Sequence, residues 1–388
     1  MPCWRTPARR SAATSDSRYN DKETEMAEIL GLGLSHYPPL SGFDENMAGI
    51  LRGRLADPDI PAYAKDPANW PAAMRAEWGD DQGRAAAARH REAMLVGCRR
   101  VRQALDEFNP DFVLIWGDDQ YENFKEDIIP AFCVQAYDDM TVHPWRHASA
   151  SAMFDAKTQD AYGGGKPNVW QETADTAMLL RGHPQAARHL AEQLLLNEFD
   201  IAYSYQPLHH PGLAHAFLNA VLYLDYDRRG FPYPVVPVQI NCYGRAVVSY
   251  KGFASPWADR GRPLDPPSPT PRRCMRFGAE IARILRASPW RVAVVASSSW
   301  SHAFLVDKTF RIQPDVAADR RLYEALVAGD YAFWEHYTLP QLEDSAQQEV
   351  LNWFALVGAM KELGLKLEWS DFVETWVFNS SKVAAIAR

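Results

Sequence analysis

The fold is decided by the segment Asp111-Phe-Val-Leu-Ile-Trp-Gly-Asp-Asp-Gln120. Residues 112–116 form an unbroken apolar run, which is typical of a strand buried on both faces. Just before it, residues 83–108 carry Ala, Leu and Val at helical spacing, and Asn109-Pro110 ends that helix. Helix followed by buried strand is the alternation of layered α/β proteins, so the sequence predicts an α/β fold.

The same alternation continues along the chain. Further strands are predicted at 27–34, 200–205, 234–241 and 291–296, and further helices at 184–196, 213–223, 273–287 and 345–363. Residues 129–147 and 254–272 are predicted to be loops. We therefore expect a central, mostly parallel or mixed sheet flanked by helices, with a largely helical C-terminal part.

The chain shows no linker or internal repeat that would divide it, so residues 27–388 are predicted to form a single layered domain. Residues 41–82, rich in Pro, Asp, Gly and Trp, are predicted to be an irregular insertion with short helical pieces. Residues 1–26 lack the apolar core of a secretory signal. They are predicted to be a disordered leader, with Met26 resembling a native start.

Composition narrows the classes of partner and compartment. The 388 residues are 47% apolar, enough to bury a large core. A net charge of −8, spread without long blocks, argues against nucleic acid as a partner. No apolar stretch is long enough to span a bilayer, so no membrane partner is expected. The five cysteines show no CxxC pairing, which favours a reducing compartment, and we expect a cytoplasmic protein.

Polar side chains follow several of the predicted strands. His36 follows the first strand, and His302 follows the strand at 291–296. Asp118 and Gln120 follow the central strand, where the period of two places them on one face. Because ligands of open α/β sheets collect at the carboxyl ends of strands, this pattern suggests an enzyme with a metal ion between them.

Two further positions belong to the same pattern. Glu349 opens the predicted C-terminal helix and shares, by helical spacing, the apolar stripe of Trp353 and Leu356. A carboxylate on a buried stripe needs a cation or a proton. Tyr243 follows the strand at 234–241 and is a candidate pocket residue.

In their order along the chain, these motifs resemble the class III extradiol ring-cleavage dioxygenases, the family of the protocatechuate 4,5-dioxygenase β-subunit. The resemblance runs from about residue 28 to 375. It is carried by Ser35-His36-Tyr-Pro, Pro110-Asp-Phe-Val-Leu-Ile-Trp-Gly-Asp-Asp-Gln120, Leu208-His-His210-Pro-Gly, Pro271-Arg-Arg-Cys-Met-Arg-Phe-Gly-Ala-Glu-Ile, Ser299-Trp-Ser-His302 and Glu349-Val-Leu-Asn-Trp353.

The resemblance implies a site for Fe(II), with His36 and Glu349 as ligands and position 120 as the third. It implies that His302 is the catalytic base and later acid. It also implies that His210, or else His209, lines the substrate pocket, where His210 would take part in catalysis. Trp300, Tyr243 and Asp118 are further candidate pocket residues because of their positions after predicted strands. The implied reactants are a small aromatic molecule and O2, and relatives often form homodimers.

The chain departs from the family at Gln120, where the resemblance places a second iron-binding histidine. Gln120 could ligate directly through its amide oxygen. Another group could replace it: Asp118 from the same strand end, or one of His209, His210 and His143. The metal site could also be lost or hold another divalent ion.

The sequence therefore predicts an oxidoreductase, an Fe(II)-dependent dioxygenase that opens a catecholic or aminophenolic ring. One alternative is a non-catalytic relative that binds no metal. Another is a metal-dependent hydrolase on the same fold, since a Lewis-acidic ion with an open position also activates water.

Overall fold

The structure is a computed structural model that describes residues 27–146, 165–245, 251, 257 and 265–388. The predicted leader, 1–26, and most of the predicted loop at 254–272 lie outside the described residues.

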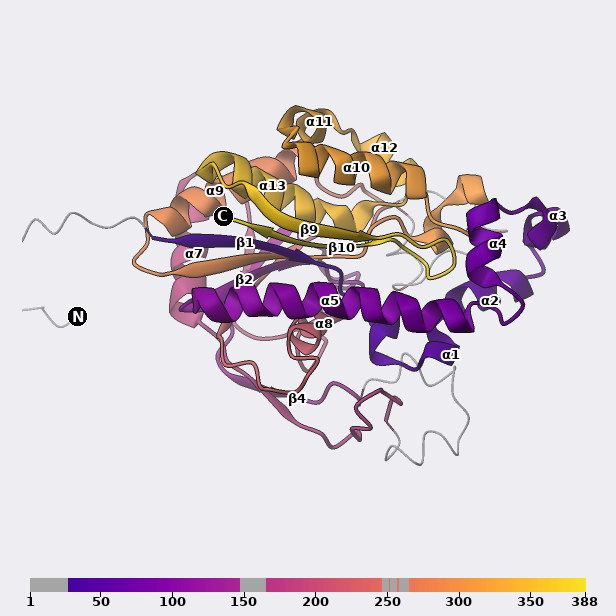
Figure 1. Ribbon diagram of the computed structural model, residues 1–388. Helices are drawn as coiled ribbons and strands as arrows, with labels where there is room; N and C mark the ends of the chain where they lie inside the picture. Colours follow the sequence, from indigo (N-terminus) through magenta and orange to yellow (C-terminus); the bar gives the residue numbers. More distant parts are fainter. Residues whose placement is uncertain (1–26, 147–164, 246–250, 252–256, 258–264) are drawn as a thin grey trace, which may run out of the picture.

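The centre of the fold is a sheet of eight strands (Figure 1). In spatial order these are β6 (Ala202–Ser204), β3 (Phe132–Gln135), β7 (Val235–Ile240), β2 (Phe112–Gly117), β8 (Val292–Ser297), β1 (Ile29–Leu34), β10 (Lys382–Ala387) and β9 (Leu367–Val373). The four adjacent strands β7, β2, β8 and β1 are parallel, whereas β3, β10 and β9 are each antiparallel to a neighbour. The carboxyl ends of the four parallel strands therefore meet at one end of the sheet.

Helices cover both faces of this sheet, which explains why β2 is apolar at every position. One face carries α5 (Arg84–Phe108) and α8 (His215–Leu224); the other carries α7 (Pro184–Leu196), α9 (Pro271–Arg286) and α13 (Leu351–Leu363). Val113 and Ile115 pack in the core on the α5 side, and Leu114 and Trp116 pack in the core on the α9 side. The predicted α/β fold with a mixed sheet is thus confirmed.

The C-terminal part is largely helical, as predicted, but its last residues form strands. Helices α10 (Val316–Ala328), α11 (Tyr331–His336) and α12 (Leu339–Asp344) precede α13 and cover its outer side (Figure 1). After α13 the chain returns to the sheet as β9 and β10, which the sequence analysis did not predict. The predicted loop at 129–147 likewise holds β3 and β4 (Met140–Val142), the latter paired with β5 (Met178–Leu180).

The segment 41–82 consists of short helical pieces at one end of α5 (Figure 1). They are α1 (Asp44–Met47), α2 (Gly49–Ala56), α3 (Ala62–Lys65) and α4 (Ala72–Trp78). Glu77 on α4 accepts hydrogen bonds from Thr375 Oγ1 (2.6 Å) and from the backbone N–H groups of Trp376 (2.6 Å) and Val377 (3.1 Å). This Glu77 clamp ties the segment to the loop that leads into β10.

Helices α9 and α13 pack backbone against backbone. A Cβ at Gly278 would lie 1.8 Å from the carbonyl oxygen of Ala355, and a Cβ at Gly358 would lie 2.0 Å from that of Met275. On the sheet side, a Cβ at Gly33 would lie 2.2 Å from the indole of Trp353. These three contacts fix α13 against β1 and α9, and with it the turn that precedes α13. Among the described helices, none has the length and apolarity that crossing a membrane requires.

Replacing Gly358 by alanine should destabilise the protein, because the added methyl group must push α9 and α13 apart. Overpacking of this kind costs about 1–3 kcal/mol or more. The control is Gly53→Ala in α2, where the added Cβ has no neighbour within 4 Å and should stabilise the helix by about 0.5–1 kcal/mol. Urea titrations of both variants give the free energies of unfolding. An unchanged value for Gly358→Ala would contradict the backbone contact.

Candidate active site

The carboxyl ends of the parallel strands bring the predicted site residues together. His36 lies two residues after β1, Asp118 one residue after β2, and His302 five residues after β8. Glu349 lies on a short 3-10 turn, Gln348–Val350, directly before α13. The glycine contacts that fix α13 therefore also fix the place of Glu349 opposite the strand ends.

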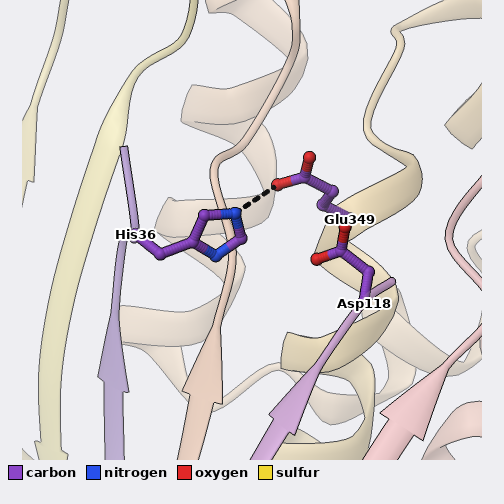
Figure 2. A group of neighbouring side chains, drawn as sticks. All are labelled: His36, Asp118 and Glu349. Carbon is purple, nitrogen blue, oxygen red and sulfur yellow. Dashed lines mark ion pairs between the residues drawn. The ribbon is translucent and has the colours of Figure 1, made fainter. Parts of the chain in front are cut away.

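His36, Asp118 and Glu349 form the centre of the site. Figure 2 shows their side chains pointing toward one another from β1, β2 and the turn before α13. Each offers one ligand atom, and these atoms all lie within 4.8 Å of one another. All three residues are buried, and no described residue offers a hydrogen bond to Asp118 Oδ1. Two buried carboxylates at this separation need a proton or a cation between them.

The hydrogen bonds of Ser297 determine the tautomer of His36. The Ser297 hydroxyl donates its one hydrogen to the carbonyl oxygen of Ala216 (2.7 Å). Its oxygen must therefore accept the hydrogen bond of 3.1 Å that joins it to His36 Nδ1. His36 then carries its proton on Nδ1 and presents the lone pair of Nε2 to the site. Burial favours this neutral form by lowering the pKa of His36 to about 4, against the opposing charge of Glu349.

The lone pair of His36 Nε2 faces Glu349 Oε2 at 3.4 Å, along the dashed line in Figure 2. Two acceptors in this position repel each other unless a positive charge lies between them. The Glu349 carboxylate is held from its other sides by the backbone N–H of Ser299 (2.9 Å) and by His302 Nε2 (3.0 Å). Burial would raise the pKa of Glu349, but the neighbouring His302, which also donates a hydrogen bond to it, outweighs burial and lowers the pKa to about 2.

Asp118 and Asp119 have opposite surroundings. The Asp119 carboxylate accepts the backbone N–H groups of Glu122, Asn123 and Phe124 and the hydroxyl of Tyr243 (2.9 Å). Asp119 thus builds the turn after β2. The pKa of Asp118 lies well above its usual range because of burial and because of the charge of Glu349. Asp118 therefore points at the site while its neighbour holds the loop.

A cavity of about 320 Å³, a volume that includes space open to solvent, adjoins Asp118 and Glu349, two of the three central residues. Its polar lining includes Asp118, Gln120, His302 and Glu349, and Gln348 beside them. The rest of the lining is Cys242, Tyr243, Phe304 and Leu305. Tyr243, a predicted pocket residue, and Gln120, a predicted metal ligand, both lie in the lining of this cavity.

Other predicted site residues lie elsewhere. Trp300 is fully buried in the core and packs edge-on against Trp353 (5.6 Å between ring centroids), so it does not wall the cavity. The reason is that the chain after β8 does not continue as a strand, so alternate positions do not share a face. His209 pairs with Asp127 at 2.9 Å and is half-exposed. Neither His209 nor His210 lines the cavity, and His143 bonds to the carbonyl oxygen of Thr176.

The sequence analysis missed a second pair of ionisable residues, Glu122 and His215. His215, in the first turn of α8, lies edge-on to His36 with ring centroids 5.1 Å apart. Its Nδ1 lies 2.8 Å from Glu122, which also accepts the His215 backbone N–H. Burial would lower the pKa of His215, but the Glu122 carboxylate outweighs it and the pKa rises to about 10. Little in the sequence pointed to this pair, because positions 118, 119, 120 and 122 are all polar.

Replacing Ser297 by alanine should weaken metal binding, because His36 loses the partner that fixes its tautomer. Losing such a supporting contact typically costs about 10–100-fold in metal affinity. Ser288→Ala is the matched control: its buried hydroxyl also donates to a backbone carbonyl (Leu285, 2.6 Å), but it precedes β8 at the opposite end of the strand. Anaerobic titration calorimetry measures both affinities, and equal losses would contradict the role given to Ser297.

Comparison with known proteins supports a relationship. No protein-family model matches the chain. Among curated proteins, the 2,3-dihydroxyphenylpropionate/2,3-dihydroxicinnamic acid 1,2-dioxygenases of Burkholderia vietnamiensis and Paraburkholderia xenovorans are each 28% identical, over 232 and 229 residues. That of Photorhabdus laumondii is 22% identical over 231 residues. The first alignment spans 60% of this chain and 53% of the relative, so the chain spans about half the length of the curated relatives it matches.

Among solved structures, an uncharacterized protein from Escherichia coli K12 is similar with a TM-score of 0.40 and 11% identity, over 76% of this chain and 91% of the other. Over about 60% of its length, the chain is thus similar in sequence to curated proteins named as ring-cleaving dioxygenases.

Proposed function

We propose that the protein is an Fe(II)-dependent extradiol-type dioxygenase, which opens a catecholic or aminophenolic ring with O2. The observation that carries this proposal is the contact of the His36 Nε2 lone pair with the Glu349 carboxylate beside a cavity that also holds His302. The names of the curated relatives support the ring-cleaving reaction.

The residues present fit a divalent metal ion. His36 offers a neutral imidazole nitrogen, Glu349 offers a carboxylate oxygen, and the strand end at 118–120 supplies a third group. Two of these groups repel each other without a cation, and Asp118 Oδ1 is buried without a partner among the described residues. Fe(II) bound by one face of ligands would supply open positions for a chelating diol and for O2.

His302 is the residue that moves protons in this proposal. It lines the cavity, and its position is fixed by the bond from its backbone N–H to the carbonyl oxygen of Ala346 (2.9 Å). The next residue, Ala303, donates its N–H to the carbonyl oxygen of Asn379 (2.7 Å). An imidazole can take a proton from a substrate hydroxyl near neutral pH and return it later in the reaction. Because His302 Nε2 donates to Glu349 Oε1, its other ring nitrogen, Nδ1, carries the lone pair, and Nδ1 is the atom at which we place this transfer.

The apolar wall of the cavity suits an aromatic ring. Phe304 packs edge-on against His302, with ring centroids 5.4 Å apart, and Leu305 lies next to it. Tyr243 adds a ring whose hydroxyl is already bound to Asp119, so it contributes its face more than its polar tip. A flat ring between these groups would hold its oxygen atoms toward His36 and Glu349 and exclude water.

Replacing His302 by alanine should leave the metal content intact but reduce turnover by about 10²–10⁴-fold, the usual contribution of a general acid–base group. His336→Ala, which changes an exposed histidine on α11, is the control. Metal content is measured by elemental analysis and turnover by oxygen uptake. Full activity of His302→Ala would remove the proposed base.

The proposed function is tested on the wild-type protein by anaerobic reconstitution with Fe(II), followed by oxygen uptake with a panel of catechols and aminophenols. Bound iron together with ring-dependent uptake is the expected result. Absence of metal under all conditions would contradict the proposal and favour a non-catalytic relative. Bound zinc with hydrolytic turnover would favour a hydrolase instead.

A further inference from the structure

We propose that Asp118, rather than Gln120, is the third metal ligand of this chain, so that one imidazole and two carboxylates hold the ion. This inference rests on the proposed function for the presence of a metal, but its test measures metal binding and not turnover. It departs from the ligand set implied by the resemblance, in which position 120 is a histidine.

The first argument is geometric. The ligand atoms of His36, Asp118 and Glu349 converge within 4.8 Å of one another, and they come from three segments distant in sequence. Asp118 directly follows β2, so the register of the central parallel strands fixes its backbone. Gln120 lies two residues further along, where the chain has left the sheet, and only partly buried.

The second argument compares Asp118 with Asp119. Both side chains are buried, but Asp119 has backbone and Tyr243 donors around its carboxylate, whereas Asp118 Oδ1 has no partner among the described residues. A buried carboxylate oxygen without a donor is costly. The turn after β2 is already held by Asp119. No hydrogen bond among the described residues therefore explains why Asp118 Oδ1 is buried. A cation between Asp118 and Glu349 explains it.

The third argument concerns charge and donor type. Two carboxylates and the neutral His36 balance a divalent ion, whereas two imidazoles and one carboxylate leave one positive charge. The chain thus replaces a neutral nitrogen donor at 120 with an anionic oxygen donor at 118. Because carboxylates suit Mn(II) and imidazoles suit Ni(II) and Zn(II), the site should favour oxygen-preferring ions more than a two-histidine site does.

The test compares Asp118→Asn with Gln120→Leu in the full chain. Asp118→Asn keeps the shape but loses an anionic donor; it should weaken Mn(II) binding on the order of 100-fold or more, because loss of a mere supporting contact already costs 10–100-fold. Gln120→Leu should change the affinity by less than about threefold, well below the 10–100-fold loss that removal of a supporting contact typically causes. Asp225→Asn, at a buried carboxylate beside Arg102 at the end of α8, is the control for burial. Anaerobic calorimetry and the Mn(II) electron paramagnetic resonance signal report binding.

A thermal measurement separates a ligand from a structural residue. Without metal, Asp118→Asn should melt at or above the wild-type temperature, because the repulsion with Glu349 is gone. With metal, its melting temperature should rise less than that of the wild type. A lower melting temperature of the metal-free variant, with an unchanged metal-induced rise, would overturn the proposal.

The double variant Asp118→Asn/Gln120→His tests the donor type. It restores an imidazole at 120 and should raise the ratio of Ni(II) to Mn(II) affinity above the wild-type ratio. An unchanged ratio would overturn the argument from donor type.

The outcomes distinguish this inference from the proposed function. If Asp118→Asn loses metal but the wild-type protein consumes no oxygen with any diol, the ligand assignment stands and the proposed function fails. If the wild type cleaves diols while Gln120→Leu, and not Asp118→Asn, loses metal, the function stands and this inference fails. A wild-type chain that binds no divalent ion overturns both.

Discussion

The structure depends on the burial of two carboxylates, Asp118 and Glu349, against one neutral imidazole, His36. Burying two carboxylates side by side costs free energy. The arrangement persists because the surrounding strands and helices fix the backbone positions of all three residues. Parallel pairing of β2 with β8, and of β8 with β1, sets Asp118 and His36 at the same end of the sheet. The close packing of α9 and α13 at Gly278 and Gly358 brings the third group to meet them. The stability of the core thus holds together groups that would otherwise separate.

The electrostatics of the site extend beyond its centre. The Glu122–His215 pair lies beside His36 and provides its own internal charge balance, because the carboxylate raises the pKa of the neighbouring imidazole. The Glu349 carboxylate contacts both His36 Nε2 and His302 Nε2. A change of charge at any one of these groups is therefore felt by the others, and position 120 cannot be interpreted apart from them.

The sequence predicted the elements whose local pattern and tertiary role agree. The segment at 112–116 is buried on both faces, and its unbroken apolar sequence predicted this. Asn109-Pro110 correctly marks the end of α5. The sequence analysis failed where pairing with a distant strand decides the secondary structure. The segment of β10 contains three alanines, which are good helix formers, but it becomes a strand because it pairs with β1. At the site, His36, His302 and Glu349 were found because they end or begin regular elements. His215 was missed and Trp300 misplaced because irregular backbone carries no periodicity from which side-chain direction can be inferred.

The Glu77 clamp makes the 41–82 segment and the loop before β10 depend on each other. Glu77 holds residues 375–377; residue 379 in the same loop accepts the N–H of Ala303, and Ala303 adjoins His302. The 41–82 segment is thus coupled, through the loop before β10, to the backbone beside His302. An exchange of the 41–82 segment that removes the carboxylate at position 77 would leave three hydrogen-bond donors of that loop without their acceptor, although some 300 residues of chain lie between the two segments.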